Sequence, residues 1–312
     1  MNTKAKGYLL GAIAEATYGM NPLFTLPLYH HGMDPDSVLF FRYLFALPIL
    51  ALMLVLRGRG FAIQRRETGS LALYGVLFSL SSLTLFQSYR YMDAGIASTL
   101  LFVYPILVAL MMTLFFHERL SVQTVSCIAV ATCGIGLLYK AADGATLSLT
   151  GTLLVGGSAL TYALYLVGVN HSRLKEMATL KITFYVTLFG WMLFALRALT
   201  GEGLQLPDRW YMWGCCLALG FFPTAISLLC TTAAIHCIGS TRTAILGVLE
   251  PVTALFFGVL VFGEVLTPRD IAGIVLIIAA VSWVIASGSM SHYFLRIRKM
   301  FPRLLRGRQP EA

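Results

Sequence analysis

Two carboxylates lie inside long apolar stretches of this chain, at Glu15 and Glu250. An ionised carboxylate is costly in apolar surroundings, so each acid is a candidate for binding a cationic substrate group or for taking up and releasing a proton. Pro251 cannot donate a hydrogen bond to the carbonyl of Gly247, which is therefore expected to be free beside Glu250. The alternative is that both acids are structural and bonded to neighbouring helices.

Arg42 is the basic residue that falls inside an apolar stretch. It could bind a substrate carboxylate through a pair of hydrogen bonds. The alternatives are a side chain that extends to the polar surface or a structural pair with Glu15 or Glu250. Aromatic and amide side chains near kinks and helix ends could contact the same substrate, although most such residues pack or anchor helices. The full set of candidate substrate-binding residues is Glu15, Tyr18, Asn21, Arg42, Gln87, Tyr91, Tyr104, Tyr162, Trp213 and Glu250.

Possible metal ligands are grouped in one short segment that contains His30, His31, Asp34 and Asp36. The glycine and proline between them favour a solvated turn over a metal site, because they prevent a regular spacing of the ligands. None of the six cysteines forms a C-x-x-C pair, which favours buried apolar side chains over metal or disulfide chemistry. We expect no cofactor, no metal and no catalytic residue.

The elements that position these residues follow from the composition. The chain has 312 residues, of which 58% are hydrophobic and 12% are charged, whereas a soluble protein carries about 25% charged residues. Apolar stretches long enough to cross a bilayer lie at about 7–28, 37–56, 69–90, 95–116, 122–139, 150–169, 180–200, 210–235, 241–262 and 270–287. They predict an all-α integral membrane protein with ten transmembrane helices.

Basic residues predict the orientation of these helices. With the N-terminus inside, 17 of the 23 lysines and arginines fall in cytoplasmic segments and five on the opposite side, and Arg42 lies within a span. This asymmetry predicts a multi-pass protein of the cytoplasmic membrane with both termini in the cytoplasm. The net charge of +9 is therefore a feature of topology, and we expect no nucleic-acid partner.

Two segments of the chain resemble each other. In both, a proline is followed 13 residues later by a glutamate, from Pro105 to Glu118 and from Pro251 to Glu264. Both glutamates are expected to end their helices near water, where a structural role in the adjoining turn is favoured over a gating role. The copies differ just before the proline, where Tyr104 in the first corresponds to Glu250 in the second.

The N-terminal stretch is also matched, because Gly7 corresponds to Gly151 at an offset of 144 residues. We therefore expect a retained span and not a cleaved leader. At the same offset Glu15 corresponds to Ala159. The predicted organisation is a five-helix repeat at 1–145, a second repeat at 146–288 and a basic amphipathic cytoplasmic tail at 289–312. Since five is odd, the second repeat is inverted relative to the first, as in many secondary transporters.

The residues at these positions resemble the drug/metabolite transporter superfamily, in particular its ten-span EamA-type members. The resemblance is carried by the paired proline and glutamate helix ends, Asn21-Pro22 in the first span, Arg42 in the second and Glu250-Pro251 in the ninth. It implies a transport function and an EamA-like fold for both repeats, and it names no single substrate.

We therefore expect a secondary transporter that moves a small amphipathic metabolite, amino-acid-like or related, by alternating access. Glu15 and Glu250 are the proton-coupling candidates. The alternatives are a membrane-embedded enzyme acting on a lipid or prenyl substrate, which would need clustered histidines and acids at one interface, and a channel, which would favour rings of polar residues. Membrane lipids are the other expected partners, and the tail is expected to bind anionic lipid.

Overall fold

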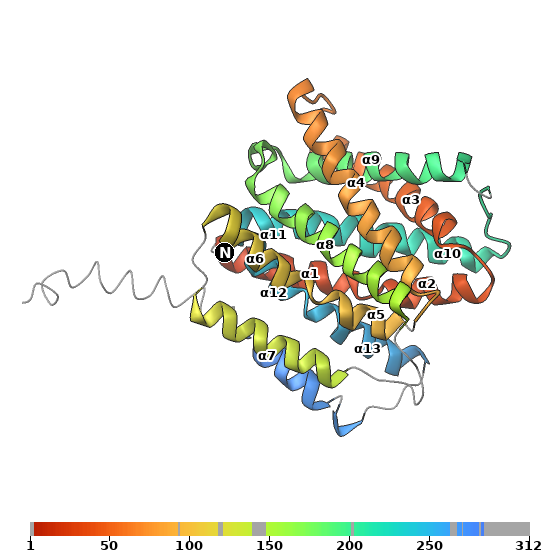
Figure 1. Cartoon of the computed structure of the whole chain (residues 1–312). Coiled ribbons are helices and arrows are strands. Elements are labelled where there is room, and N and C mark those ends of the chain that lie inside the picture. Colours follow the sequence, from red (N-terminus) through yellow and green to blue (C-terminus); the bar gives the residue numbers. More distant parts are fainter. Residues whose placement is uncertain are drawn as a thin grey trace, which may run out of the picture.

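The computed structural model describes residues 3–92, 94–117, 121–138, 148–200, 203–262, 267–269, 271–280 and 282–283, and this part of the chain is helical with no β-strand (Figure 1). Six helices are long and apolar enough to cross a membrane by length and composition. The predicted all-α membrane fold is confirmed. The predicted acids Glu118 and Glu264, the boundary between the two repeats and the basic tail lie outside the described residues.

The helices in chain order are α1 (Thr3–Tyr18), α2 (Asn21–His30), α3 (Pro35–Leu56), α4 (Arg65–Ser88), α5 (Ala94–Leu101), α6 (Tyr104–Phe116), α7 (Val122–Leu138), α8 (Leu149–His171), the 3-10 helix η1 (Arg173–Glu176), α9 (Thr179–Thr200), α10 (Trp210–Leu219), the π-helix η2 (Gly220–Ile226), α11 (Ser227–Ile238), α12 (Ser240–Leu246) and α13 (Leu249–Phe262). A further short apolar helix covers Ile271–Ala280. Each of the ten predicted stretches contains helix, but several are short or interrupted, so the count of ten spans stays a prediction.

Three of the predicted stretches are broken into two helices each. The first breaks at Gly19 and Met20, the fourth between α5 and α6, and the ninth between α12 and α13. In each case a proline lies in the first turn of the second piece, where its missing N–H and fixed backbone angle are tolerated. In the eighth stretch the chain instead passes through the π-helix η2, which contains Pro223.

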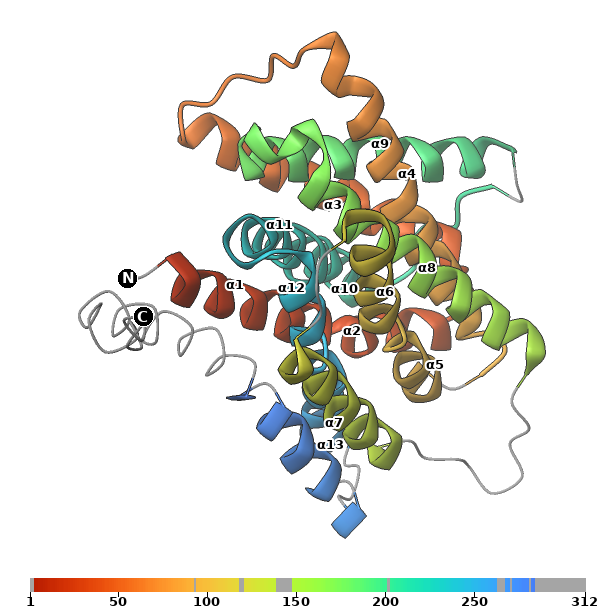
Figure 2. The ribbon, with the colours of Figure 1, turned by 60° about the vertical axis from the view of Figure 1, so that its left-hand side comes forward.

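The packing of the helices has a two-fold pattern. The extensive contact of α4 with α8 corresponds to that of α11 with α1, and the contact of α4 with α9 to that of η2 with α3. The contact of α6 with α8 corresponds likewise to that of α13 with α1. Figure 2 shows α7 beside the last helix, on the side of the bundle away from α9, and Gly134 of α7 packs against Gly273 and Ile277.

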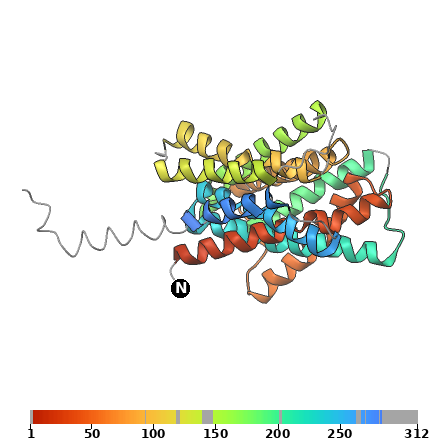
Figure 3. The same cartoon turned by 90° about the horizontal axis from the view of Figure 1, so that it is seen from below.

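Most helices run along one common direction when the bundle is seen from below (Figure 3). Large apolar side chains such as Leu56, Phe115 and Leu199 remain exposed on its outer surface. An apolar outer surface around parallel helices is expected for segments that lie in lipid. A polar site is therefore expected in the buried interior between the two halves.

Candidate functional site

The two intramembrane acids are brought together by two broken helices. Glu15 lies in the last turn of α1 and is 2% exposed, and Glu250 lies in the first turn of α13 and is 7% exposed. The side chains are close enough to interact electrostatically. Gly19, at the break after α1, packs against the backbone carbonyl of Glu250, and a Cβ there would overlap it. The break between α1 and α2 therefore packs directly against the start of α13.

The carbonyl of Gly247 is not free as expected. It accepts a hydrogen bond from the backbone N–H of Glu250 at 3.0 Å, because the chain turns between α12 and α13 instead of continuing as one kinked helix. The polar group at this position is therefore the Glu250 carboxylate, and the carbonyl of Gly247 is not a free acceptor.

A third broken helix reaches the same place through Tyr104, the first residue of α6. Its hydroxyl lies over Gly247, where any Cβ would overlap it. This hydroxyl is buried and has no hydrogen-bond partner among the described residues. The ring contacts Tyr162 of α8 edge-on, with centroids 4.9 Å apart, and Tyr162 in turn stacks on Tyr18 at 6.5 Å. Tyr18, Tyr104 and Tyr162 form an aromatic wall within electrostatic range of Glu15 or Glu250.

Arg42 is fully buried, at 0% exposure, so it does not extend to the membrane surface. Its Nε donates to Thr224 Oγ1 at 2.6 Å and its Nη2 to the carbonyl of Pro223 at 3.2 Å, both in the π-helix η2. The guanidinium also lies over the ring of Tyr18, 5.7 Å from its centroid. Its described hydrogen bonds reach neither Glu15 nor Glu250, although Glu250 is within electrostatic range. Arg42 is anchored by η2 and keeps Nη1 unpaired among the described residues.

Asn21 and Thr25 lie one turn apart on α2 and are both buried. Neither polar atom of the Asn21 side chain, nor the Thr25 hydroxyl, has a hydrogen-bond partner in the part of the chain that the structure describes. A buried polar group without a partner costs about 1–3 kcal/mol, so such groups are rare without a reason. Together with Arg42 Nη1, they provide donors and acceptors available to a ligand.

The remaining predicted site residues are more exposed than the buried cluster. Gln87 is half-buried in the last turn of α4. Tyr91 is 53% exposed and Trp213 is 40% exposed, and Trp213 packs edge-on against Phe41. The structure therefore does not bring Tyr91 and Trp213 to the buried cluster of Glu15 and Glu250.

Two residues of the site were missed by sequence reasoning, Thr25 and Thr224. Thr25 follows Asn21 by four residues, so helical periodicity could have indicated it. Thr224 directly follows Pro223 inside an apolar stretch, but its contact with a residue 182 positions away had no local signal.

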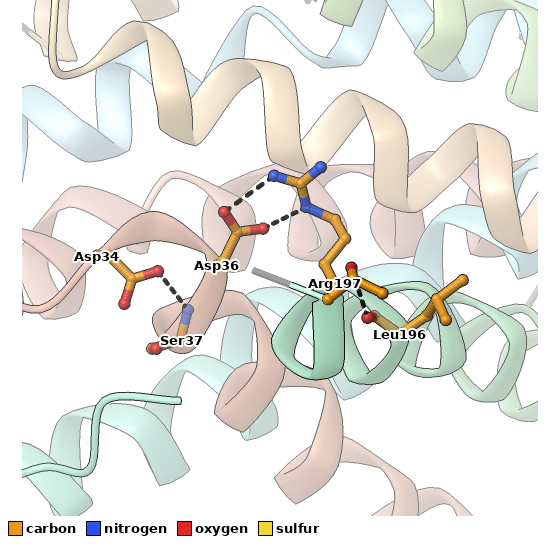
Figure 4. Close-up of polar contacts among 6 residues, drawn as sticks. Asp34, Asp36, Ser37, Leu196 and Arg197 are labelled. Atoms are coloured by element: carbon orange, nitrogen blue, oxygen red, sulfur yellow. Dashed lines mark hydrogen bonds and ion pairs between the residues drawn. The ribbon is translucent and has the colours of Figure 1, made fainter. Parts of the chain in front are cut away.

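The segment with possible metal ligands makes protein contacts instead. Asp34 accepts from the backbone N–H of Ser37 at 3.0 Å, and Asp36 pairs with Arg197 through contacts of 2.5 and 3.1 Å (Figure 4). His31 bonds to the hydroxyl of Tyr211 at 2.7 Å. Within the described ranges no group of three or more histidine, cysteine or acidic side chains could hold a metal ion.

Comparison with known proteins places this arrangement in a family. The sequence profile of the EamA-like transporter family matches residues 5–140 and again residues 149–286. An uncharacterized transporter of Archaeoglobus fulgidus is 28% identical over 251 residues, covering 80% of this chain and 86% of the relative. The uncharacterized transporter YcbK of Bacillus subtilis is 22% identical over 270 residues, covering 83% and 86%. A solved crystal structure shares the fold with a TM-score of 0.77 at 18% identity, covering 90% of this chain and 96% of the other. With both halves matched by the same profile, the chain belongs to the EamA-like transporter family.

Proposed function

We propose that this chain is a secondary transporter that moves a small amphipathic metabolite, amino-acid-like or related, across the cytoplasmic membrane by alternating access. The observation that carries the proposal is the meeting of three broken helices at Glu15, Glu250 and Tyr104. Broken helices near the seam between repeats form the substrate and coupling-ion sites of many secondary transporters. The names of the relatives point to transport rather than to an enzyme.

The acids are proposed to couple transport to protons. Glu15 and Glu250 are buried and within electrostatic range of each other. Two carboxylates in such surroundings repel when both are ionised, so the pair favours a single negative charge. Arg42 is near Glu250 and attracts its charge. In this scheme Glu15 and Glu250 share one exchangeable proton, so replacing either acid disturbs coupling.

The substrate is proposed to lie between the acids and the unpaired groups of α2 and α3. A carboxylate of the substrate would receive hydrogen bonds from Arg42 Nη1 and Asn21 Nδ2, while a cationic group would face Glu250. The aromatic wall of Tyr18, Tyr104 and Tyr162 would cover its apolar part. Access alternates between the cytoplasmic side, where the N-terminus lies by the distribution of basic residues, and the opposite side.

The test uses the purified protein in proteoliposomes. Charge movement on a solid-supported membrane is recorded during challenges with amino acids, vitamins and nucleosides, and active compounds are followed as uptake under an imposed pH gradient. Glu250→Gln is expected to abolish or uncouple transport while the protein stays folded. Glu176→Gln, which removes an exposed acid of η1, is the matched control and should transport normally. Uptake by Glu250→Gln that is unchanged and still driven by protons would exclude the coupling role.

A further inference from the structure

A polar opening lies at the end of the bundle where α1 begins, away from the acid cluster. It is an open pocket of about 380 Å³ lined by the ends of α6 and α8 and by the junction of α11 with α12. Figure 2 shows these three elements next to one another. Phe116 on its rim is 12 residues along α6 from Tyr104, or about 18 Å at the rise of a helix. The pocket is therefore separate from the site of Glu15 and Glu250.

One wall of this pocket is apolar. It is formed by Met112 and Phe116 of α6 and by Ile238 at the end of α11. The ring of Phe116 lies against the ring of His171, with centroids 3.7 Å apart. These side chains form an apolar surface that the apolar part of a ligand can contact.

The other side chains of the lining are polar or positively charged. They are Asn170, His171, Ser240, Thr241 and Arg242. Asn170 Nδ2 donates to Ser240 Oγ at 3.2 Å, which fixes the two side chains and leaves the serine hydroxyl proton available to donate. Arg242 is exposed, and none of the described lining residues is acidic.

Positive charge is concentrated at this end of the bundle. Partial burial and then the charge of Arg242 lower the pKa of Lys4 from its ordinary value, so the two cations lie near each other. Clusters of basic side chains at the cytoplasmic end of membrane helices attract anionic groups, including lipid headgroups. An anion entering the pocket would relieve the repulsion between Arg242 and Lys4.

We infer that this pocket binds an amphipathic anion, with its phosphate or carboxylate at Arg242 and Ser240 and its apolar chain against Met112, Phe116 and Ile238. The inference does not rest on the proposed coupling role of Glu15 and Glu250. The anion can come from a free metabolite or from a lipid headgroup, since both present the same chemistry to the guanidinium.

The test is calorimetric titration of hexyl phosphate into the full chain in phosphatidylcholine nanodiscs. The wild type is expected to bind it, and Arg242→Gln is expected to bind at least about tenfold more weakly, because a charge-assisted hydrogen bond is lost. Arg209→Gln removes an exposed arginine at the start of α10 and is expected to change the affinity less than about twofold. Equal affinity in wild type and Arg242→Gln, or an equal loss in Arg209→Gln, would overturn the inference.

Two further arms test the apolar wall and the source of the anion. Phe116→Ala should weaken hexyl phosphate and leave the weaker binding of inorganic phosphate unchanged, and equal effects on both probes would exclude the apolar wall. Replacing phosphatidylcholine by phosphatidylglycerol should lower the apparent affinity for hexyl phosphate in the wild type if lipid headgroups occupy the pocket. An unchanged affinity upholds the pocket as a site for free anions.

Discussion

The contact between α1 and α11 is equivalent to the contact between α4 and α8 in the two-fold packing pattern. The two contacts are nevertheless built differently. α4 and α8 are continuous over 24 and 23 residues. They are joined by Ser158, whose hydroxyl donates to the carbonyl of Ser81 at 2.8 Å. On the other side, α1 breaks at Gly19 and α11 follows the π-helix η2.

The difference extends to the polar groups of each interface. Asn21 and Thr25 of α2 and Arg42 of α3 have buried atoms without partners among the described residues, and both helices pack on α10. Ser81 and Ser158, in contrast, satisfy each other. The serines of the α4–α8 interface are therefore satisfied within it, whereas α2 and α3 hold the buried unpaired groups that we propose serve substrate and protons.

The largest expected effect comes from moving an acid to the α4–α8 interface. Ala159, the counterpart of Glu15, is fully buried on α8. Ala159→Glu is expected to lower the free energy of unfolding by about 3 kcal/mol, because no partner is provided for a carboxyl group inside the bundle. Thermal unfolding in detergent measures this. Glu15→Ala is the matched change and should keep the stability while abolishing transport; a stable Ala159→Glu would show that the interfaces are equivalent.

A smaller loss is expected where the breaks of the fourth and ninth stretches meet. Gly247→Ala places a methyl group where the Tyr104 hydroxyl lies, and overpacking of this kind costs about 1–3 kcal/mol. The control is Gly157→Ala on α8, where a Cβ meets nothing within 4 Å. Thermal unfolding should separate the two variants, and Tyr104→Phe added to Gly247→Ala should recover part of the loss. Equal melting temperatures for both alanine variants would contradict the close approach.

The third prediction separates stability from function. Ser158→Ala removes the hydrogen bond to Ser81 and is expected to cost about 1 kcal/mol with little effect on transport. Thr25→Ala removes a hydroxyl that has no partner among the described residues, so it should leave stability unchanged or higher and reduce transport several-fold. Melting temperature and uptake rate are measured on the same preparations. If Ser158→Ala loses transport at full stability, the α4–α8 interface has a role in transport, and the prediction is contradicted.

The smallest effect is expected at the end of the bundle opposite the N-terminus, where α3 meets α9. The ion pair of Asp36 with Arg197 has side chains that are 30% and 41% exposed. Asp36→Asn is therefore expected to cost less than about 1 kcal/mol, and less still in high salt. Unfolding at two salt concentrations tests this. A loss of several kcal/mol would mean that this pair, and not the α4–α8 interface, holds the halves together.

Much of this architecture follows from local patterns. Long apolar stretches predict the helices because a bilayer demands about 20 apolar residues. Prolines in the first turns of α6 and α13 predict interruptions, and these are present as complete breaks. The asymmetry of Glu15 against Ala159 was visible from the repeat offset alone.

Other parts depend on contacts that no local pattern encodes. Tyr104 approaches Gly247 across 143 positions, and Arg42 binds Thr224 across 182. The exposure of Tyr91 and Trp213 was likewise not encoded locally, since aromatic residues at helix ends face outward as readily as inward. The π-helix at Pro223 was expected only as continuous apolar helix.

The π-helix η2 also distinguishes the two halves of the chain. Its counterpart in the two-fold packing pattern is α4, which is a continuous α-helix over 24 residues. A π turn closes on the fifth residue and not the fourth, so it widens the helix locally. Pro223 and Thr224, which bind Arg42, both lie in this widened segment. The arginine of the candidate site is thus held by a helix irregularity that its own half of the chain does not repeat in α4.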